Sequence, residues 1–271
     1  MIAEESTAFA KITKPSYDGG LGFNFKWNMG WMNDALGYLD TDPFFRKGSH
    51  DKLTFSITYA FAENYILPLS HDEVVHGKRS LLNRCKGEYD EMFENYKTFL
   101  GYYMTHPGKK LLFMGSEFGQ FIEWDYRKQL DWFLLDYPRH RSLQKYSREL
   151  NAFYLAHHEL FEQDCDYNGF KWIVVGDSVQ NIYSYIRYAK NGDYLIIILN
   201  FSSVDRAGYV MGVPDEGNFI TTFSSASKKY MGKLTRYPSY KARPKGAHGY
   251  PYSIRLKIHG NSITILKNIK V

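Results

Sequence analysis

The sequence predicts an α/β fold over roughly its first 165 residues and an all-β fold over the rest. In the first part, short apolar runs alternate with stretches whose apolar residues recur with a helical period. From about Phe170 onward the runs are dense in β-branched and aromatic residues, and no helical pattern interrupts them. We therefore expect an α/β region at residues 1–167 and an all-β sandwich domain at residues 168–271.

Four apolar runs of the α/β region have the character of strands, at residues 1–3, 22–29, 65–69 and 111–114. Two helices are expected as well, because apolar residues fall on one face of residues 92–103 and of residues 143–160. This makes four βα units, whereas a closed barrel of eight takes roughly 250 residues. The region is therefore either an open sheet or part of a larger barrel, and we favour the second, with Met1 an internal methionine.

The all-β region should contain strands near residues 172–175, 182–188 and 194–201. The dipeptide Asn191-Gly192 between the last two predicts a hairpin. A second hairpin is expected where residues 255–258 and 262–266 flank His259-Gly260-Asn261. Because this strand pattern looks self-contained, we expect the region to fold by itself.

The amino-acid composition limits the functional classes to which the protein can belong. Aromatic residues make up 17% of the chain, which fits either a well-packed core or a surface on which sugar rings stack. The net charge of +5 is mild and the basic residues are spread out, so nucleic-acid binding is not predicted. The chain has two distant cysteines and no apolar run approaching 18 residues. We expect a cytoplasmic protein that does not bind membranes.

Acidic residues follow three of the expected strands, as Glu4-Glu5, Asp72-Glu73 and Glu117. In βα architectures the active site is built at the carboxyl ends of the strands. Acids are also common where helices begin, so a structural role is the better interpretation of one such acid alone. For acids after three successive strands, with a histidine before one of them, the two interpretations are equally good. Paired carboxylates at such an edge suit glycosyl transfer, in which one acid protonates the leaving oxygen and another attacks or stabilises the reacting sugar.

No metal or cofactor is predicted. His71 and His76 are five residues apart and miss the spacing of a zinc-binding helix. The glycines at residues 19, 20 and 22 lack the full dinucleotide-binding pattern and precede a strand where that pattern should follow one.

Four segments resemble the second half of the catalytic (β/α)8 TIM barrel of bacterial glycogen branching enzymes, which are members of the α-amylase superfamily. They are MIAEEST (1–7), GLGFNFKWNMGWMNDAL (20–36), ILPLSHDEVVHGKRSL (66–81) and HPGKKLLFMGSEFGQ (106–120). The resemblance covers essentially the whole chain, including a tail similar to the superfamily's C-terminal β domain. It implies the C-terminal half of the barrel, strands five to eight, followed by that domain.

The resemblance also implies roles for individual residues. Glu4 matches the general acid/base after strand five, and Asp72 matches the transition-state-stabilising acid after strand seven. His71 matches the histidine that contacts the reacting sugar. Glu5 is the less favoured acid of its pair, because the family motif places the role on the first acid; adjacent strand residues also point to opposite faces. The segment that helps line the glucan groove after strand six is matched by Trp27, Asn28, Met29 and Trp31.

The family's nucleophilic aspartate, which follows strand four, has no match in these 271 residues. The resemblance thus implies a 1,4-α-glucan branching enzyme of glycogen biosynthesis. This chain would lack the N-terminal half of the barrel, and the isolated chain is expected to have no activity. Its substrate would be an α-1,4-glucan such as glycogen or amylose. Two alternatives remain, a hydrolase or 4-α-glucanotransferase of the same superfamily and a non-catalytic glucan-binding fragment.

Overall fold

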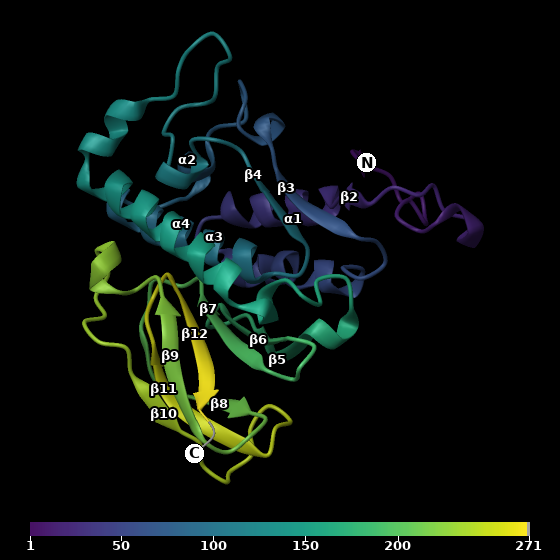
Figure 1. The fold of residues 1–271 in the computed structure, drawn as a ribbon. Coiled ribbons are helices and arrows are strands. Elements are labelled where there is room, and N and C mark those ends of the chain that lie inside the picture. Colours follow the sequence, from purple (N-terminus) through teal and green to yellow (C-terminus); the bar gives the residue numbers. More distant parts are fainter. Residues whose placement is uncertain (270–271) are drawn as a thin grey trace.

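The computed structural model describes residues 1–269. Within these residues a small parallel sheet among helices comes first, and two antiparallel sheets, one large and one small, follow it (Figure 1). The four α-helices all precede residue 157; they are α1 (Met29–Leu39), α2 (Leu81–Arg84), α3 (Tyr89–Thr105) and α4 (Pro138–Ala156). None of the helices in the described part of the chain is both long and apolar enough to cross a bilayer.

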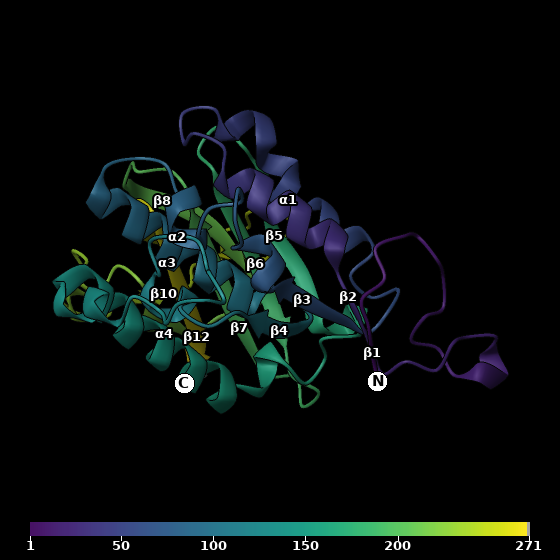
Figure 2. The ribbon, with the colours of Figure 1, turned by 90° about the horizontal axis from the view of Figure 1, so that it is seen from above.

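The parallel sheet has the order β1-β2-β3-β4, and each strand pairs in parallel with the next along the chain. Its strands lie where the sequence predicted them; they are β1 (Ile2–Ala3), β2 (Phe25–Trp27), β3 (Tyr65–Leu69) and β4 (Lys109–Leu112). Figure 2 shows α1 lying alongside these strands. Leu67, Leu69 and Leu112 point toward the helices and join their core. One face of the sheet is therefore covered by α1 and α3.

Capping side chains and prolines in the sequence explain where the helices begin and end. Asn28 caps α1, because its side-chain oxygen accepts a hydrogen bond from the backbone N–H of Trp31. At α3 the side chains of Glu88 and Glu91 form a capping box, and the helix ends at His106, which precedes a proline. Pro138 occupies the first turn of α4, where its missing N–H has no cost.

The second part of the chain forms two antiparallel sheets, of which the larger has the order β10-β9-β12-β7-β6-β5 and the smaller pairs β11 with β8. Their strands are β5 (Phe170–Asp177), β6 (Ile182–Tyr188), β7 (Tyr194–Asn200), β8 (Arg206–Val213), β9 (Asn218–Ser224), β10 (Ser239–Lys241), β11 (Tyr252–Ile258) and β12 (Ser262–Ile269). The hairpin predicted at Asn191-Gly192 is confirmed, with Gly192 at φ +88° between β6 and β7.

The hairpin predicted around His259-Gly260-Asn261 is wrong. β11 pairs with β8, whereas β12 pairs with β7 and β9, so the three-residue link crosses from one sheet to the other. The reason is burial. Residues 262–266 of β12 are all buried, as suits a central strand of a sheet covered on both faces.

The larger sheet is packed on both faces. Side chains on one face meet the small β8–β11 sheet; among them are Ile182, Ile186, Ile196, Ile198 and Leu266. Side chains on the other face belong to the same core as α1, α3 and α4; among them are Tyr183, Tyr185, Leu195, Ile197, Leu199, Ile263 and Ile265. The expectation that the all-β region is self-contained is therefore wrong, because one of its two cores is shared with the helices.

A buried arginine holds this shared interface together. Arg187 in β6 is fully buried and donates to Asp164 Oδ1 at 2.7 Å. It also donates to the carbonyl oxygens of Thr105 at 2.6 Å, Leu160 at 3.2 Å and Gly169 at 3.2 Å. The guanidinium thus ties the end of α3 and the link that leads into β5 to β6, the strand next to the edge of the larger sheet.

Candidate functional site

The residues predicted to carry chemistry lie at one edge of the parallel sheet. Glu4 directly follows β1, Asn28 follows β2, and His71-Asp72 lie in the turn after β3. The carboxyl ends of parallel strands meet at the same edge, so these residues share it, with the end of β2 between the two acids. Glu117, in the short 3-10 helix after β4, lies beyond the same edge.

The two acids of the first pair differ in their surroundings. Glu4 is exposed, and within residues 1–269 no hydrogen bond or ion pair engages its carboxylate. Glu5 lies 2.7 Å from the ammonium of Lys26 and accepts from the backbone N–H of Thr7 at 2.7 Å. The bond to Lys26, followed by that to Thr7, lowers the pKa of Glu5 to about 2. Glu5 is a fixed, permanently charged structural group, whereas Glu4 is free to meet a ligand.

The acids of the second pair, Asp72 and Glu73, also differ from each other in their surroundings. Asp72 and His71 are each about half exposed, and His71 Nε2 lies 3.4 Å from Asp72 Oδ1. Glu73 is buried and accepts from both the backbone N–H and the hydroxyl of Ser70, at 2.6 and 2.7 Å. The Ser70 oxygen in turn accepts from the Asp72 backbone N–H at 3.2 Å. The buried acid therefore fixes the turn, and the turn presents its neighbours to solvent.

Two aromatic residues that were not singled out from the sequence stand beside His71. The His71 ring lies 6.0 Å from that of Phe113, just after β4, and 6.1 Å from that of Trp124. Phe113 and Trp124 meet edge to face at 5.0 Å. The Trp124 backbone N–H donates to the carbonyl of Val74 at 2.9 Å, which holds its loop against the turn that carries Asp72. The feature of the sequence that could have identified Phe113 as a site residue is its position at the end of a strand.

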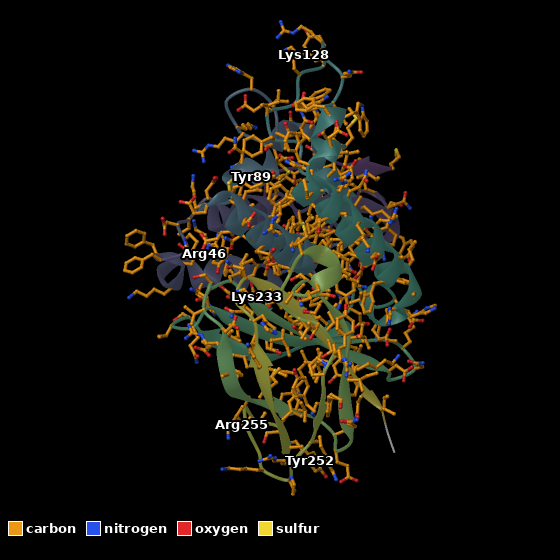
Figure 3. All side chains as sticks on the ribbon, turned by 90° about the vertical axis from the view of Figure 1, so that its left-hand side faces the viewer. Arg46, Tyr89, Lys128, Lys233, Tyr252 and Arg255 are labelled. Carbon is orange, nitrogen blue, oxygen red and sulfur yellow. The ribbon has the colours of Figure 1, made fainter. Side chains whose placement is uncertain are left out.

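The loop after β4 adds a cavity and exposed apolar surface. A cavity of about 510 Å³ lies between Val75-His76 and residues 122–128, with Trp124 in its wall. Several large apolar side chains of this loop are at least half exposed; they are Met114, Ile122, Tyr126, Trp132, Phe133 and Tyr137. In Figure 3 Lys128 lies at one tip of the molecule, while Tyr252 and Arg255 of the all-β region lie at the opposite one. This loop meets the candidate site at His71, whose ring lies beside that of Trp124.

The predicted groove residues after β2 are only partly supported. Trp27 is half-buried and lines a cavity of about 630 Å³ together with Glu5 and Lys26. Asn28 is 2% exposed and serves as the helix cap described above. Trp31 is fully buried, and its indole N–H donates to the hydroxyl of Tyr102 at 3.1 Å.

A groove-lining role is therefore wrong for Trp31, whereas Asn28 and Met29 line the same cavity as Trp27, although Asn28 is only 2% exposed. The physical reason is that Trp31 lies one turn into α1 on its core-facing side, which the sequence motif alone did not reveal. Among residues 1–269 no group of three or more His, Cys, Asp and Glu side chains is arranged to hold a metal ion.

Comparison with known proteins finds one matching family model and relatives that share a name. Residues 172–269 match the family described as alpha amylase, C-terminal all-beta domain. The chain is 51% identical, over 95% of its length, to the 1,4-alpha-glucan branching enzyme GlgB of Halothermothrix orenii. It is 48% identical over its whole length to the enzyme of the same name from Geobacillus stearothermophilus, and 45% identical over 98% of its length to that of Aquifex aeolicus.

The chain spans 41–43% of the length of these relatives. In fold it is similar to a pullulanase from Anoxybacillus sp. LM18-11 that was solved with maltotetraose, with a TM-score of 0.60 at 13% identity. That match covers 90% of this chain and 35% of the pullulanase. The resemblance to the branching enzymes is confirmed, and so is the α-amylase-type C-terminal β region.

Proposed function

We propose that this chain is the C-terminal part of a 1,4-α-glucan branching enzyme and that the protein acts on an α-1,4-glucan such as glycogen or amylose. The observation that carries the proposal is the pair of free acids, Glu4 and Asp72, at one edge of a parallel sheet. Each is free because a neighbouring acid, Glu5 or Glu73, takes the structural role. The similarity to branching enzymes over nearly the whole chain supports the reaction type.

The parallel sheet would be strands five to eight of a (β/α)8 barrel. Its strict order, with α1 between β2 and β3, α2 and α3 between β3 and β4, and one face packed on helices, fits half of such a barrel. We place the boundary with the C-terminal domain near residue 167, shortly before β5 begins at Phe170. The other strands, and the nucleophile, would come from the portion of the relatives' length that this chain does not span.

In the proposed retaining reaction the nucleophile attacks the anomeric carbon of an α-1,4 bond, and Glu4 protonates the departing glucan oxygen. Glu4 then removes the proton from the 6-hydroxyl of an acceptor glucan, which displaces the nucleophile and forms an α-1,6 branch. In such enzymes the nucleophile and the acid/base lie about 5–5.5 Å apart. The exposure of Glu4 suits this double role, because its carboxyl must reach both the leaving and the incoming oxygen.

Asp72 and His71 would hold the donor sugar. A carboxylate at Asp72 stabilises the positive charge that develops on the ring, and His71 at 3.4 Å from it can donate a hydrogen bond to a sugar hydroxyl. Phe113 and Trp124 support the His71 ring from the side. Trp27 would lie between the two acids at the end of β2.

A branching site must let a glucan hydroxyl compete with water for the covalent intermediate. Aromatic platforms that hold an acceptor chain at high effective concentration meet this demand. The exposed aromatic residues of the loop after β4, among them Tyr126 and Trp132, would provide such platforms, since the same loop packs against His71 through Trp124.

The test uses the whole protein that contains this chain, purified from a host without its own glucan-modifying enzymes and incubated with amylose. We expect iodine staining to weaken while few reducing ends appear, and isoamylase to release short linear chains from the product. Reducing ends that rise in step with the loss of staining, with nothing released by isoamylase, would identify a hydrolase. New linear chains without α-1,6 bonds would identify a 4-α-glucanotransferase, and glycogen binding without turnover a non-catalytic binder.

A further inference from the structure

Lys26 occupies an unusual place for a charged residue, in the middle of β2. Its Cα is the register partner of Ala3 in β1, and its backbone N–H donates to the carbonyl of Asn64. The residue as a whole is 5% exposed. Burying an ammonium is costly unless charged and polar partners surround it, so the location of those partners indicates what the lysine is for.

All three partners of the Lys26 ammonium belong to the segment that follows Glu4. They are Glu5 Oε2 at 2.7 Å, the carbonyl oxygen of Thr7 at 2.9 Å and that of Phe9 at 3.5 Å. An ammonium has three N–H donors, and three acceptors lie within reach here. One side chain thus gathers five consecutive residues, 5–9, against β2.

Little else fixes this segment. Residues 4–10 form no helix or strand, and all of them except Glu5 are exposed. Their own hydrogen bonds, from Thr7 N–H to Glu5 and from Phe9 N–H to the Thr7 hydroxyl, are internal to the segment. The next attachment is at Ile12, whose backbone N–H donates to Glu63.

Glu4 therefore sits between two fixed points. Ala3 is held in the strand ladder by its pairing with Lys26, and Glu5 is held by the Lys26 ammonium. Neighbouring residues of an extended chain point to opposite faces, so the bond on Glu5 turns Glu4 away from Lys26. Because Glu5 has a pKa of about 2, its ion pair with Lys26 persists at neutral pH.

We propose that Lys26 is a positioning residue for the candidate acid/base Glu4, acting through Glu5 and the backbone of residues 7–9. This rests on the proposed function. The ammonium makes no contact with a reacting group itself; it sets the direction of the Glu4 carboxyl while leaving that carboxyl free of bonds. A displacement of about 1 Å in a reacting group can lower the rate by about 10².

The test compares two buried lysines in the whole protein. Lys97 on α3 is a matched control, because it is 2% exposed and its ammonium also binds one carboxylate, Glu94 at 3.0 Å, and one carbonyl, Tyr230 at 2.8 Å. Lys26→Met should lower kcat about 10²-fold with KM within about threefold. Lys97→Met should destabilise the protein to a similar degree in thermal unfolding and leave kcat within about twofold.

Further variants separate positioning from general stability. Lys26→Arg, which keeps the charge, should recover most of the kcat lost in Lys26→Met. Amide hydrogen exchange of residues 4–10 should speed up in Lys26→Met and stay unchanged in Lys97→Met. If Lys26→Met does not fold, Glu5→Gln tests the other side of the same tie and should lower kcat roughly 10-fold, as expected of a smaller displacement.

The inference fails if Lys26→Met and Glu5→Gln keep kcat within about threefold, or if Lys97→Met loses kcat in parallel. Glu4→Gln separates this failure from that of the proposed function. Activity abolished in Glu4→Gln but kept in Lys26→Met contradicts the positioning role alone, whereas activity kept in Glu4→Gln contradicts the proposed function.

Discussion

The six-stranded antiparallel sheet and the carboxyl edge of the four-stranded parallel sheet use their side chains in opposite ways. On the antiparallel sheet both faces are covered, and residues 194–200 of β7 are buried without exception. At the carboxyl edge of the parallel sheet, Asp72 and Met114 are about half exposed and Tyr126 is 81% exposed. The two regions thus differ in exposure, although they are joined through one shared core, and the proposed chemistry lies at the exposed edge.

The first test of this comparison separates the two regions. Removal of residues 1–169 would bare the helix-facing side of the larger sheet, whose side chains contribute about 1.5–3 kcal/mol each when buried. We expect residues 170–271 expressed alone to aggregate or to show poor amide dispersion and no cooperative melting. The 1–271 chain under the same conditions is the reference. A monomeric, cooperatively melting 170–271 fragment would show that the shared core is dispensable.

The second test removes the buried ion pair between Arg187 and Asp164 and leaves the apolar cores of the two regions intact. Arg187→Met leaves the buried Asp164 with Lys109 as its remaining partner and removes the donor to three backbone carbonyls, which should cost about 3–5 kcal/mol in urea unfolding. The control is Lys229→Met, which breaks a partly exposed pair with Glu149 and should cost about 0–1 kcal/mol. Equal losses in the two variants would mean that the buried pair has no special role in joining the regions.

A third test uses pH. Burial, followed by the nearby Lys110, lowers the pKa of His106 from 6.5 to about 3. The folded protein holds this ring neutral, with Nδ1–H donating to the Pro107 carbonyl and Nε2 accepting from the Ser56 hydroxyl. The unfolded chain takes up a proton below about pH 6.5, so stability falls as pH drops from there toward 3.

We expect a loss of about 2 kcal/mol between about pH 7.5 and pH 5 from His106 alone. The measurement is the free energy of unfolding in urea at both pH values, for the wild type and for His106→Gln. The variant should lose this part of the pH dependence. An unchanged pH dependence would show that His106 is already protonated in the folded protein.

The sequence predicted the elements better than it predicted their partners. Periodicity located the strands of the parallel sheet and helices α3 and α4, because each depends on its own alternation of apolar residues. The β11–β12 hairpin failed because a short polar link fits a turn within one sheet and a crossing between two sheets equally well. The shared core was missed for a related reason, since a strand buried on both faces carries no mark of what covers each face.

At the candidate site, position along the chain identified the acids but not their neighbours. Position after strands gave Glu4-Glu5, Asp72-Glu73 and Glu117, and the family resemblance selected Glu4 and Asp72 among them. The structure shows Glu5 bound to Lys26. The aromatic support at Phe113 and Trp124 comes from residues about 40 to 50 positions away, which only the fold brings beside His71. Trp31 was misjudged because its motif contains no sign of which face of α1 it occupies.

The most direct test of the account measures activity and stability together in Glu4→Gln of the whole protein. Because Glu4 is exposed and makes no bonds within residues 1–269, its loss should leave the melting temperature within about one degree of the wild type. Branching should fall by about 10² to 10⁴, the usual contribution of a positioned general acid/base. Glu117→Gln, another acid beyond the same edge, should keep branching within a few-fold. A Glu4→Gln protein that branches amylose at the wild-type rate, or that loses activity only through unfolding, would contradict the assignment of the chemistry to this edge.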